Sequence, residues 1–416
     1  MSLTSALSIA RSGLTMSSRA ADLISQNVAN ALTEGYGRRE LELSASSTGG
    51  VSIAGVTRFA ERAITADRRV AEAAQAGAGV TAAFHSTVED AVGTPGSGTS
   101  LSDMVGELES ALVTAASTPQ SDAALQSVVD RAQDLASRVG QMGDTIYAAR
   151  RQADASVGTS ITSINEALRG VEALNAQIAS LHGADASGLL DQRQSLIDGI
   201  AGLVPLREVE GQDGRVSLYT ASGTALLDGR AGELARGTGG GLTLNGRDLP
   251  TSAIEGGALA AQISVRDDLG VAAQADIDAF AADLQSRLPG LFEGPPLKVQ
   301  ASVAASPQQV RDGAGGGGTS GDASRIVGML NALTAGAGAG GAADALASSA
   351  ASSRVVAEDR QAYATARYDT LHSAELEGGV DTDVEMQDLL LVQQIYSANA
   401  KVIQAIDGML GQLMEL

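Results

Sequence analysis

The sequence predicts a mainly α-helical protein with a small β-rich inserted domain, whose long terminal helices pair as an antiparallel coiled coil in an elongated, multi-domain subunit. Three observations predict this fold class. Apolar residues recur with coiled-coil spacing at both ends, long helical segments fill much of the first half, and short β-like runs lie among glycines after Leu203. Helices on both sides of the β-rich part mean that the chain goes out and returns, which brings its two ends together.

Each end of the chain carries an apolar seam with a mean spacing of 3.5 residues, the period of coiled coils. The N-terminal seam consists of Leu3, Leu7, Ala10, Leu14, Ser17, Ala21, Ile24 and Val28. The C-terminal seam consists of Leu389, Val392, Tyr396, Asn399, Ile403, Ile406, Leu410 and Leu413, and it is flanked by Met386, Leu390, Val402, Ala405 and Met409. Most helical stability comes from packing of such a face. We therefore predict that both ends are mobile in the monomer and become ordered on assembly.

Composition excludes several classes of protein. Of the 416 residues, 44% are hydrophobic, enough for sizeable cores, but only 2% are aromatic, which disfavours a small-molecule pocket. The net charge of -21 would be repelled by nucleic acid and by anionic membranes. Cysteine is absent, which excludes disulfides and thiol chemistry. We expect no cleavable secretory signal and no membrane-spanning segment, because polar residues interrupt every apolar run.

Turn and breaker residues set the order of elements in the first half. The first helix should end near residues 29–32, and Thr33 to Gly37 form a turn whose two glycines are available for positive φ. Residues 38–59 alternate as a hairpin, and helix resumes near Arg62. A helix at 101–116 ends at Thr118-Pro119, and Ser121 is expected to cap the next one. Further helical periodicity covers 125–146 and, in a separate segment, 157–178. Asn175 and Asn399 lie on seams, where they either fix register or face water.

The second half begins with the β-rich part. Strands are predicted at 204–210, 215–220, 224–227, 242–244 and 297–303, with a helix at 266–288. Residues 313–321 and 335–343 are predicted to be flexible, and Asp344 is expected to cap a helix that runs to Glu375. The predicted domains are the axial helix and hairpin at 1–60, a helical domain at 61–203 with 321–374, a small β-rich outer domain at 204–320, and the C-terminal axial helix at 375–416.

No catalytic or metal-binding constellation is recognised. His85, His182 and His372 are far apart in sequence and have no ligand at helical spacing. Asp383 is expected to cap the terminal helix, with Met386 beginning its buried face, rather than to form half of a calcium loop. The glycines at 313–318 match a dinucleotide pattern, but no βαβ unit surrounds them. Asp191-Gln192-Arg193 is polar but lacks a nucleophile or base. The sequence therefore predicts a protein that is not an enzyme and has no cofactor.

Two end motifs resemble those of the bacterial flagellar axial proteins, which comprise the rod, hook and hook-associated subunits. The first runs from Gln26 to Tyr36, with Asn27 and Asn30 at the motif's asparagines and Gly35-Tyr36 at its turn. The second runs from Val380 to Ile403. Gly37 stands where the family more often has Ser or Thr. The helices at 101–139 and 164–181, together with residues 188–197, resemble the hook-associated members at the hook–filament junction. The region 211–374 is short for that family, so an outer domain is expected to be reduced or missing.

This resemblance implies a structural junction subunit. Such proteins form a ring of copies between hook and filament, and contact the hook protein and the second junction protein. They are exported to the outside of the cell through the flagellar channel, without a cleavable signal peptide, and a dedicated chaperone usually holds the C-terminal helix. Three alternatives stay open: another axial position, such as hook protein or the second junction protein; an axial protein with an enzyme grafted into its outer domain; and a secreted or signalling coiled-coil protein unrelated to flagella.

Overall fold

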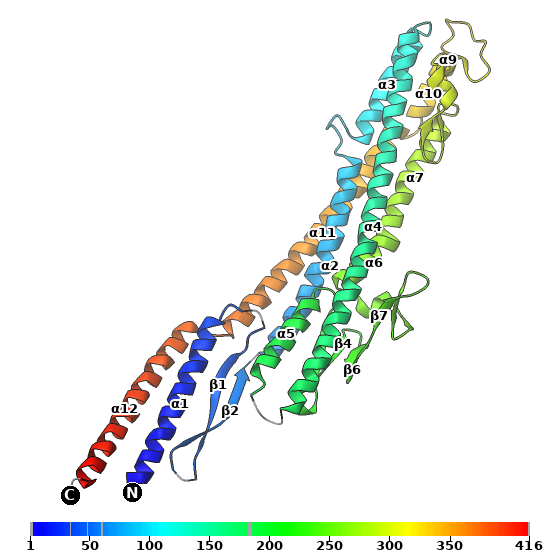
Figure 1. Cartoon of the computed structure of the whole chain (residues 1–416). Helices are drawn as coiled ribbons and strands as arrows, with labels where there is room; N and C mark the ends of the chain where they lie inside the picture. Colours follow the sequence, from blue (N-terminus) through cyan, green and yellow to red (C-terminus); the bar gives the residue numbers. More distant parts are fainter. Residues whose placement is uncertain (1–2, 34, 48, 60, 182–184, 415–416) are drawn as a thin grey trace. The chain divides into compact units, whose positions relative to one another are not determined.

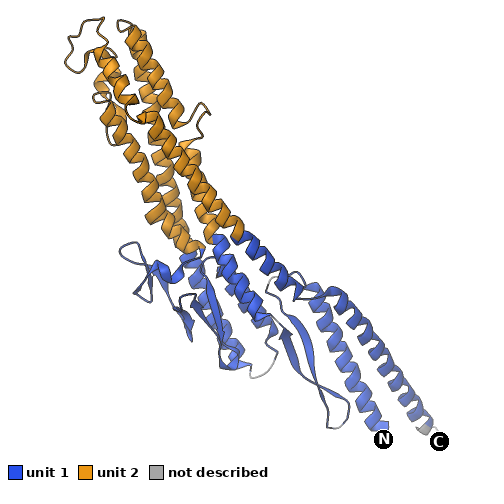
Figure 2. Cartoon of the chain, turned by 180° about the vertical axis from the view of Figure 1, so that it is seen from behind, with its two compact units in different colours: residues 1–76, 160–257, 364–416 blue, residues 77–159, 258–363 orange. Residues whose placement is uncertain are grey.

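The computed structural model describes the backbone of residues 3–33, 35–47, 49–59, 61–181 and 185–414, and side chains up to Gln412 (Figure 1). The chain divides into two compact units (Figure 2). Unit 1 comprises residues 1–76, 160–257 and 364–416, and unit 2 comprises 77–159 and 258–363. These limits differ from the four domains predicted from the sequence, because three long helices cross from one unit to the other. A compact unit need not fold independently, so the four-domain division stays a prediction.

Unit 2 is a bundle of helices. It contains the second part of α2 (Arg62–Val92), the first part of α4 (Asp122–Ser180) and most of α11 (Gly338–Glu377). Its other elements are α3 (Leu101–Ser117), α6 (Ala258–Ser264), a π-helical turn (Val265–Leu269), α7 (Gly270–Arg287), β10 (Phe292–Glu293), β11 (Lys298–Val299), α8 (Ala301–Ala305), α9 (Gln309–Asp312) and α10 (Ser324–Thr334). The seam predicted at 125–146 is buried at every position, and it packs with Leu108, Phe280 and Met329 in one core.

Unit 1 contains the chain ends and all but two of the described strands. Its helices are α1 (Leu3–Ala29), α5 (Ser187–Ala201), α12 (Thr382–Met414) and the remaining parts of α2, α4 and α11, with 3-10 turns at Gln212–Gly214 and Thr251–Ile254. The strands are β1 (Arg38–Ala45), β2 (Val51–Phe59), β3 (Leu206–Glu210), β4 (Val216–Thr220), β5 (Ala225–Asp228), β6 (Arg230–Ala231), β7 (Leu234–Arg236), β8 (Leu242–Leu244) and β9 (Arg247–Leu249). The predicted fold class, mainly helical with a small β-rich part and paired terminal helices, is confirmed.

Three antiparallel arrangements make up these strands. The hairpin predicted at 38–59 is confirmed as β1 and β2, with an irregularity in register after Glu42. Strands β3 to β6 form a four-stranded meander, and β7 to β9 form a three-stranded one. The seam of α4 at 157–178 is buried, and all of it after Val157 belongs to this unit. Two of its asparagines bind strand backbone. Asn175 exchanges hydrogen bonds with both main-chain groups of Val216, and Asn165 does the same with Leu234. Asn175 is therefore buried and does not face water.

Several predicted boundaries are wrong. The helical segments at 125–146 and 157–178 belong to one helix, α4, because nothing between them interrupts the backbone ladder. The strand predicted at 297–303 exists only at Lys298–Val299, and the following residues form α8. Most of the alanine- and glycine-rich tract at 335–343 is helical, because α11 begins at Gly338 and buries Ala339 and Ala343. Asp344 therefore lies inside α11 and caps nothing.

Helix starts follow the predicted capping chemistry in part. Ser121 accepts a hydrogen bond from the Ala124 backbone N–H at 3.3 Å, as its predicted cap role requires. Ser100 and Asp103 form a reciprocal capping box at the start of α3. At the start of α12 the cap is Asp381, whose carboxylate accepts from the N–H groups of Asp383 and Val384. The predicted cap Asp383 is thus one of the residues capped.

One helical stretch, within residues 324–412, is long and apolar enough by composition to cross a membrane, with a mean hydropathy of 1.3 over its best window. A third of that window is buried inside the protein. The stretch comprises α10, α11 and α12, which are separate helices. Buried core helices pass the same test, so this is weak support for a membrane segment, and the prediction that no segment spans a membrane stays a prediction.

Candidate assembly interface

The terminal helices α1 and α12 lie side by side and antiparallel, with both chain ends at the same end of the pair (Figures 1 and 2). On α1 the predicted seam faces inward: Ala10, Ser17 and Ile24 are buried, and Leu3, Leu7, Leu14, Ala21 and Val28 are half-buried. On α12 Ile406 is buried, Leu389, Val392, Asn399 and Ile403 are half-buried, and Tyr396 and Leu410 are exposed. The side chain of Leu413 lies outside the described residues. The pairing is confirmed, while the role of these residues in assembly stays a prediction.

Close approach of the two helices depends on a residue that the seam did not include. Gly13 is buried between Ala10 and Ser17, and a Cβ built on it would lie 2.5 Å from the Asn399 side-chain nitrogen. The Asn399 amide therefore lies directly against the bare backbone of α1. The sequence signal for Gly13 is its position between the small seam residues Ala10 and Ser17. Small residues along one row of a helix permit a second helix to pack closely.

Helix α12 keeps many large apolar side chains exposed within the chain. Its exposed large apolar side chains are Val384, Met386, Leu390, Leu391, Tyr396, Val402, Met409 and Leu410. The prediction that Met386 begins the buried face is wrong, because the residue beside it, Glu385, takes the inward position. Glu385 is only 1% exposed and accepts a hydrogen bond from Arg38 Nε at 2.7 Å, which raises the pKa of Arg38. So many exposed large apolar side chains on one helix are typical of a surface that other molecules cover.

The turn after α1 is organised by Asn27. Its buried side chain accepts from the Tyr36 hydroxyl at 2.8 Å and from the Arg39 N–H at 3.0 Å, and donates to the Arg39 carbonyl at 2.9 Å. Burial raises the pKa of Tyr36, although Arg39 stacks on its ring, so the hydroxyl stays a donor. The Asn30 side chain makes only local hydrogen bonds among the described residues: it donates to the Gln26 carbonyl and accepts from the Thr33 hydroxyl. Asn27 thereby holds the hairpin against the end of α1.

Gly35 has the left-handed conformation that the turn was predicted to need, with φ of +77°. A Cβ there would lie 3.3 Å from the Ser195 backbone nitrogen on α5, so a side chain would meet both strain and crowding. Gly37 is outside the left-handed region, contrary to the prediction that both glycines are available for it. Its lack of a side chain makes room for Arg58, whose Nε would lie 2.5 Å from a Cβ.

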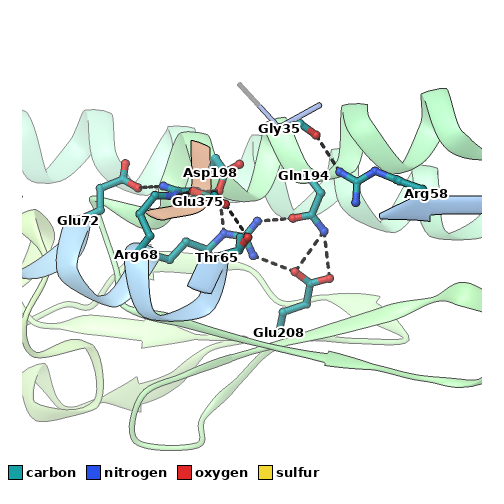
Figure 3. A network of polar contacts seen from close by, with 10 residues as sticks. Gly35, Arg58, Thr65, Arg68, Glu72, Gln194, Asp198, Glu208 and Glu375 are labelled. Atoms are coloured by element: carbon teal, nitrogen blue, oxygen red, sulfur yellow. Dashed lines mark hydrogen bonds and ion pairs between the residues drawn. The ribbon is translucent and has the colours of Figure 1, made fainter. Parts of the chain in front are cut away.

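Asp191 joins this turn to α5, and sequence reasoning gave it no role. Its carboxylate accepts from Arg58 Nε at 2.7 Å, from the Gly37 N–H at 3.2 Å, and from Arg39. Arg58 in turn donates to the Gly35 carbonyl at 2.8 Å (Figure 3). Arg193, two residues along, is buried and donates to Asn175 and to the Gly214 carbonyl. The polar run at 191–193 is therefore a docking point for the hairpin and for the β-rich part.

A second polar cluster ties α2 to α5, β3 and α11 (Figure 3). Arg69 donates to Asp198 at 2.7 Å and to Glu208 at 2.8 Å. Arg68 pairs with Asp198, with Glu72 and with Glu375 near the end of α11. Burial lowers the pKa of Arg68, but Asp198 and Glu375 outweigh it and leave that pKa raised. Burial also raises the pKa of Glu72. Because four elements meet here, this cluster holds the last part of α11 against α2, α5 and β3 within unit 1.

No metal-binding group of three His, Asp or Glu side chains occurs among the residues that the structure describes. Burial, and then Arg360, lower the pKa of His85, and the ring of His372 stacks on Tyr368. His182 lies outside the described residues. The described histidines are therefore accounted for by packing.

Two family models match the chain. The model described as flagellar hook-associated protein FlgK helical domain matches residues 85–288, and the one described as flagellar basal body rod FlgEFG protein C-terminal matches residues 377–416. Residues 85–288 are therefore similar to the helical domain of the flagellar hook-associated proteins. These matches agree with the resemblances predicted at the C-terminal helix and in the long central helices. The N-terminal motif at 26–36 lies outside both matched ranges, so its resemblance stays a prediction.

Similar members of the flagellar hook-associated protein family come from two enteric bacteria. The flagellar hook-associated protein 1 of Escherichia coli K12 is 27% identical over 243 residues, which cover 55% of this chain and 44% of that protein. The protein of the same name from Salmonella typhimurium LT2 is 28% identical over 241 residues, covering 55% and 43%. The match thus spans less than half the length of these relatives. A solved structure, the flagellar hook junction protein FlgK from Burkholderia pseudomallei, is 23% identical with a TM-score of 0.49, over 54% of this chain and 43% of that one.

Proposed function

We propose that this chain is a structural subunit of the bacterial flagellum that forms the junction between hook and filament. Its terminal helices build the junction by packing against those of neighbouring copies. The observation that carries the proposal is the set of exposed large apolar side chains on α12, a helix that belongs to the segment matched by the axial C-terminal family model. The long helices α3 and α4 favour a junction subunit over hook protein, in which we expect β structure at this place.

The partners follow from that position. They are copies of this chain in a ring, the hook protein, the second junction protein, and a cytoplasmic export chaperone that covers α12 before assembly. The subunit works outside the cell, after export through the flagellar channel. Its role is mechanical, needs no cofactor and includes no catalysis.

A strain that lacks this chain tests the proposal. We expect electron microscopy to show hooks without filaments, and filament subunit to accumulate in the medium. Re-expression of the native chain should restore filaments, whereas a chain that ends before Thr382 should not. Normal filaments in the deletion strain would contradict the proposal, and loss of the hook itself would favour an earlier axial position.

Amide exchange tests the proposed coupling between assembly and order. In the isolated chain, residues 3–29 and 382–412 should exchange quickly, and they should become protected in isolated hook–junction structures. Strong protection of both helices in the isolated chain would show that α1 and α12 form an ordinary core without neighbours.

A further inference from the structure

A groove of about 480 Å³ opens between α4 and α7 in unit 2. Its floor is apolar and includes Val139, Ile277 and Leu297, and its rim carries the carboxylates of Asp144 and Asp278. A volume of this size accommodates one or two large side chains.

Two glycines of α4, Gly140 and Gly143, line the groove. A Cβ built on Gly140 would meet nothing within 4 Å, and one on Gly143 would meet only the Gln274 side chain, at 3.4 Å. Glycine inside a helix destabilises it relative to alanine. Packing within the chain requires neither glycine, so the room that they leave suits a group from outside the chain.

The charge of the rim selects the kind of group. Asp278 accepts a hydrogen bond from Gln274 at 3.0 Å, and Asp144 has no ion pair among the described residues. Arg151 stacks on the exposed ring of Tyr147 at the groove, so a guanidinium already packs on an aromatic ring here. A cationic group next to an apolar or aromatic body would complement both the rim and the floor.

The chain itself carries such a surface on α11. Val356, Arg360 and Tyr363 lie on one face of that helix at spacings of four and three residues, and all are exposed, Tyr363 by 73%. Arg360 forms no ion pair among the described residues. Its positive charge contributes, after burial, to lowering the pKa of His85. Tyr and Arg are among the residues most enriched at the centres of interfaces.

We propose that this α11 stripe of one copy seats in the α4–α7 groove of the next. Tyr363 packs over the bare helix backbone at Gly140 and Gly143, and Arg360 pairs with Asp144 and Asp278. The inference rests on the proposed function, in which copies lie side by side. Groove and stripe share no residue, so the contact is heterologous and repeats head to tail, which generates a ring or a helical array.

Cysteine crosslinking tests the contact, because the native chain has no cysteine. A chain with Gly140→Cys and Tyr363→Cys, as the only copy in the cell, should form intermolecular disulfides on oxidation of isolated hook–junction structures. Its matched control carries Gly106→Cys and Tyr363→Cys, since Gly106 on α3 is equally open but outside the groove. No more linked chains than in this control would overturn the proposal.

Charge reversal gives an independent measurement. Arg360→Glu should reduce the number of filament-bearing hooks at least tenfold, as should Asp144→Arg combined with Asp278→Arg, and all three changes together should restore filaments. Normal filaments with Arg360→Glu, or no restoration by the triple variant, would overturn the contact.

Filling the groove separates binding from folding. Gly140→Leu should block filaments, whereas Gly106→Leu should not, and neither should lower the melting temperature of the isolated chain. Normal filaments with Gly140→Leu would count against the groove. If the deletion strain keeps its filaments, the proposed function fails; if it loses them while these variants assemble normally, only the groove contact fails.

Discussion

Asp191→Ala should destabilise unit 1 because it removes the anion that two largely buried arginines share. The side chains of Asp191, Arg39 and Arg58 are 16%, 15% and 13% exposed, so water solvates none of them well. Breaking a buried ion pair by removing one partner costs roughly 3–5 kcal/mol, since the remaining charge stays buried without compensation. The Gly37 N–H also loses its acceptor. We expect a loss in this range, centred where the hairpin meets α5.

Local amide exchange is the appropriate assay, because a chain with two units need not unfold in one step. Exchange in β1 and α5 should accelerate by roughly two to three and a half orders of magnitude, at about 1.4 kcal/mol per tenfold. The control is Glu210→Ala, which removes an ion pair with Arg62 whose partners are 43% and 76% exposed and which should cost at most about 1 kcal/mol. Equal, small effects of both substitutions would refute the reasoning.

Three further predictions concern the turn after α1, the terminal helices and one cap. Gly35→Val should lower the stability of the folded chain by about 1–3 kcal/mol, because φ at this position is +77° and α5 is close. Counts of filament-bearing hooks and amide exchange in α5 measure the effect. Native values for both would exclude a strained turn. Leu14→Ala and Ile403→Ala should barely change the melting temperature of the isolated chain but reduce filament-bearing hooks, since full burial in the assembly is worth roughly 2–5 kcal/mol; a large loss in the isolated chain would contradict this. The Ser100 hydroxyl and nearby backbone N–H groups hold the pKa of Asp103 below its usual range. This stabilisation is complete above the unfolded pKa, about 3.9, and is lost as the pH falls through the folded pKa. Asp103→Asn should therefore destabilise unit 2 at neutral pH, and the difference in stability from the native chain should shrink below about pH 4. A difference that does not change with pH would argue against a role of the carboxylate.

Periodicity predicted the fold well because long seams average over many residues. The seam from Leu125 to Ile146 and the seam of α1 are placed where their spacing requires. Boundaries were harder, since they depend on single residues. Asp381, Asp383 and Asp344 are all chemically able to cap, and the backbone around each decides which one does. Nothing local in the sequence distinguishes them.

The candidate interface was predicted in part. The paired helices and the left-handed Gly35 follow from spacing and from glycine's freedom of φ. Asp191 and Glu385 were not assigned their roles, because an acidic residue is ordinarily solvated and its arginine partners are remote in sequence. Asp191 meets Arg39 from 152 positions away, and Glu385 meets Arg38 from 347 positions away. Only the tertiary fold brings such charges together.

The asparagines of α4 have an evolutionary consequence. Asn165 and Asn175 hold the β-rich part through main-chain atoms of Leu234 and Val216. Hydrogen bonds to the peptide group of a residue do not depend on which side chain that residue carries. Strands β4 and β7 are thereby free to drift in composition, or to be replaced by strands of different origin, while the same two amides continue to anchor them.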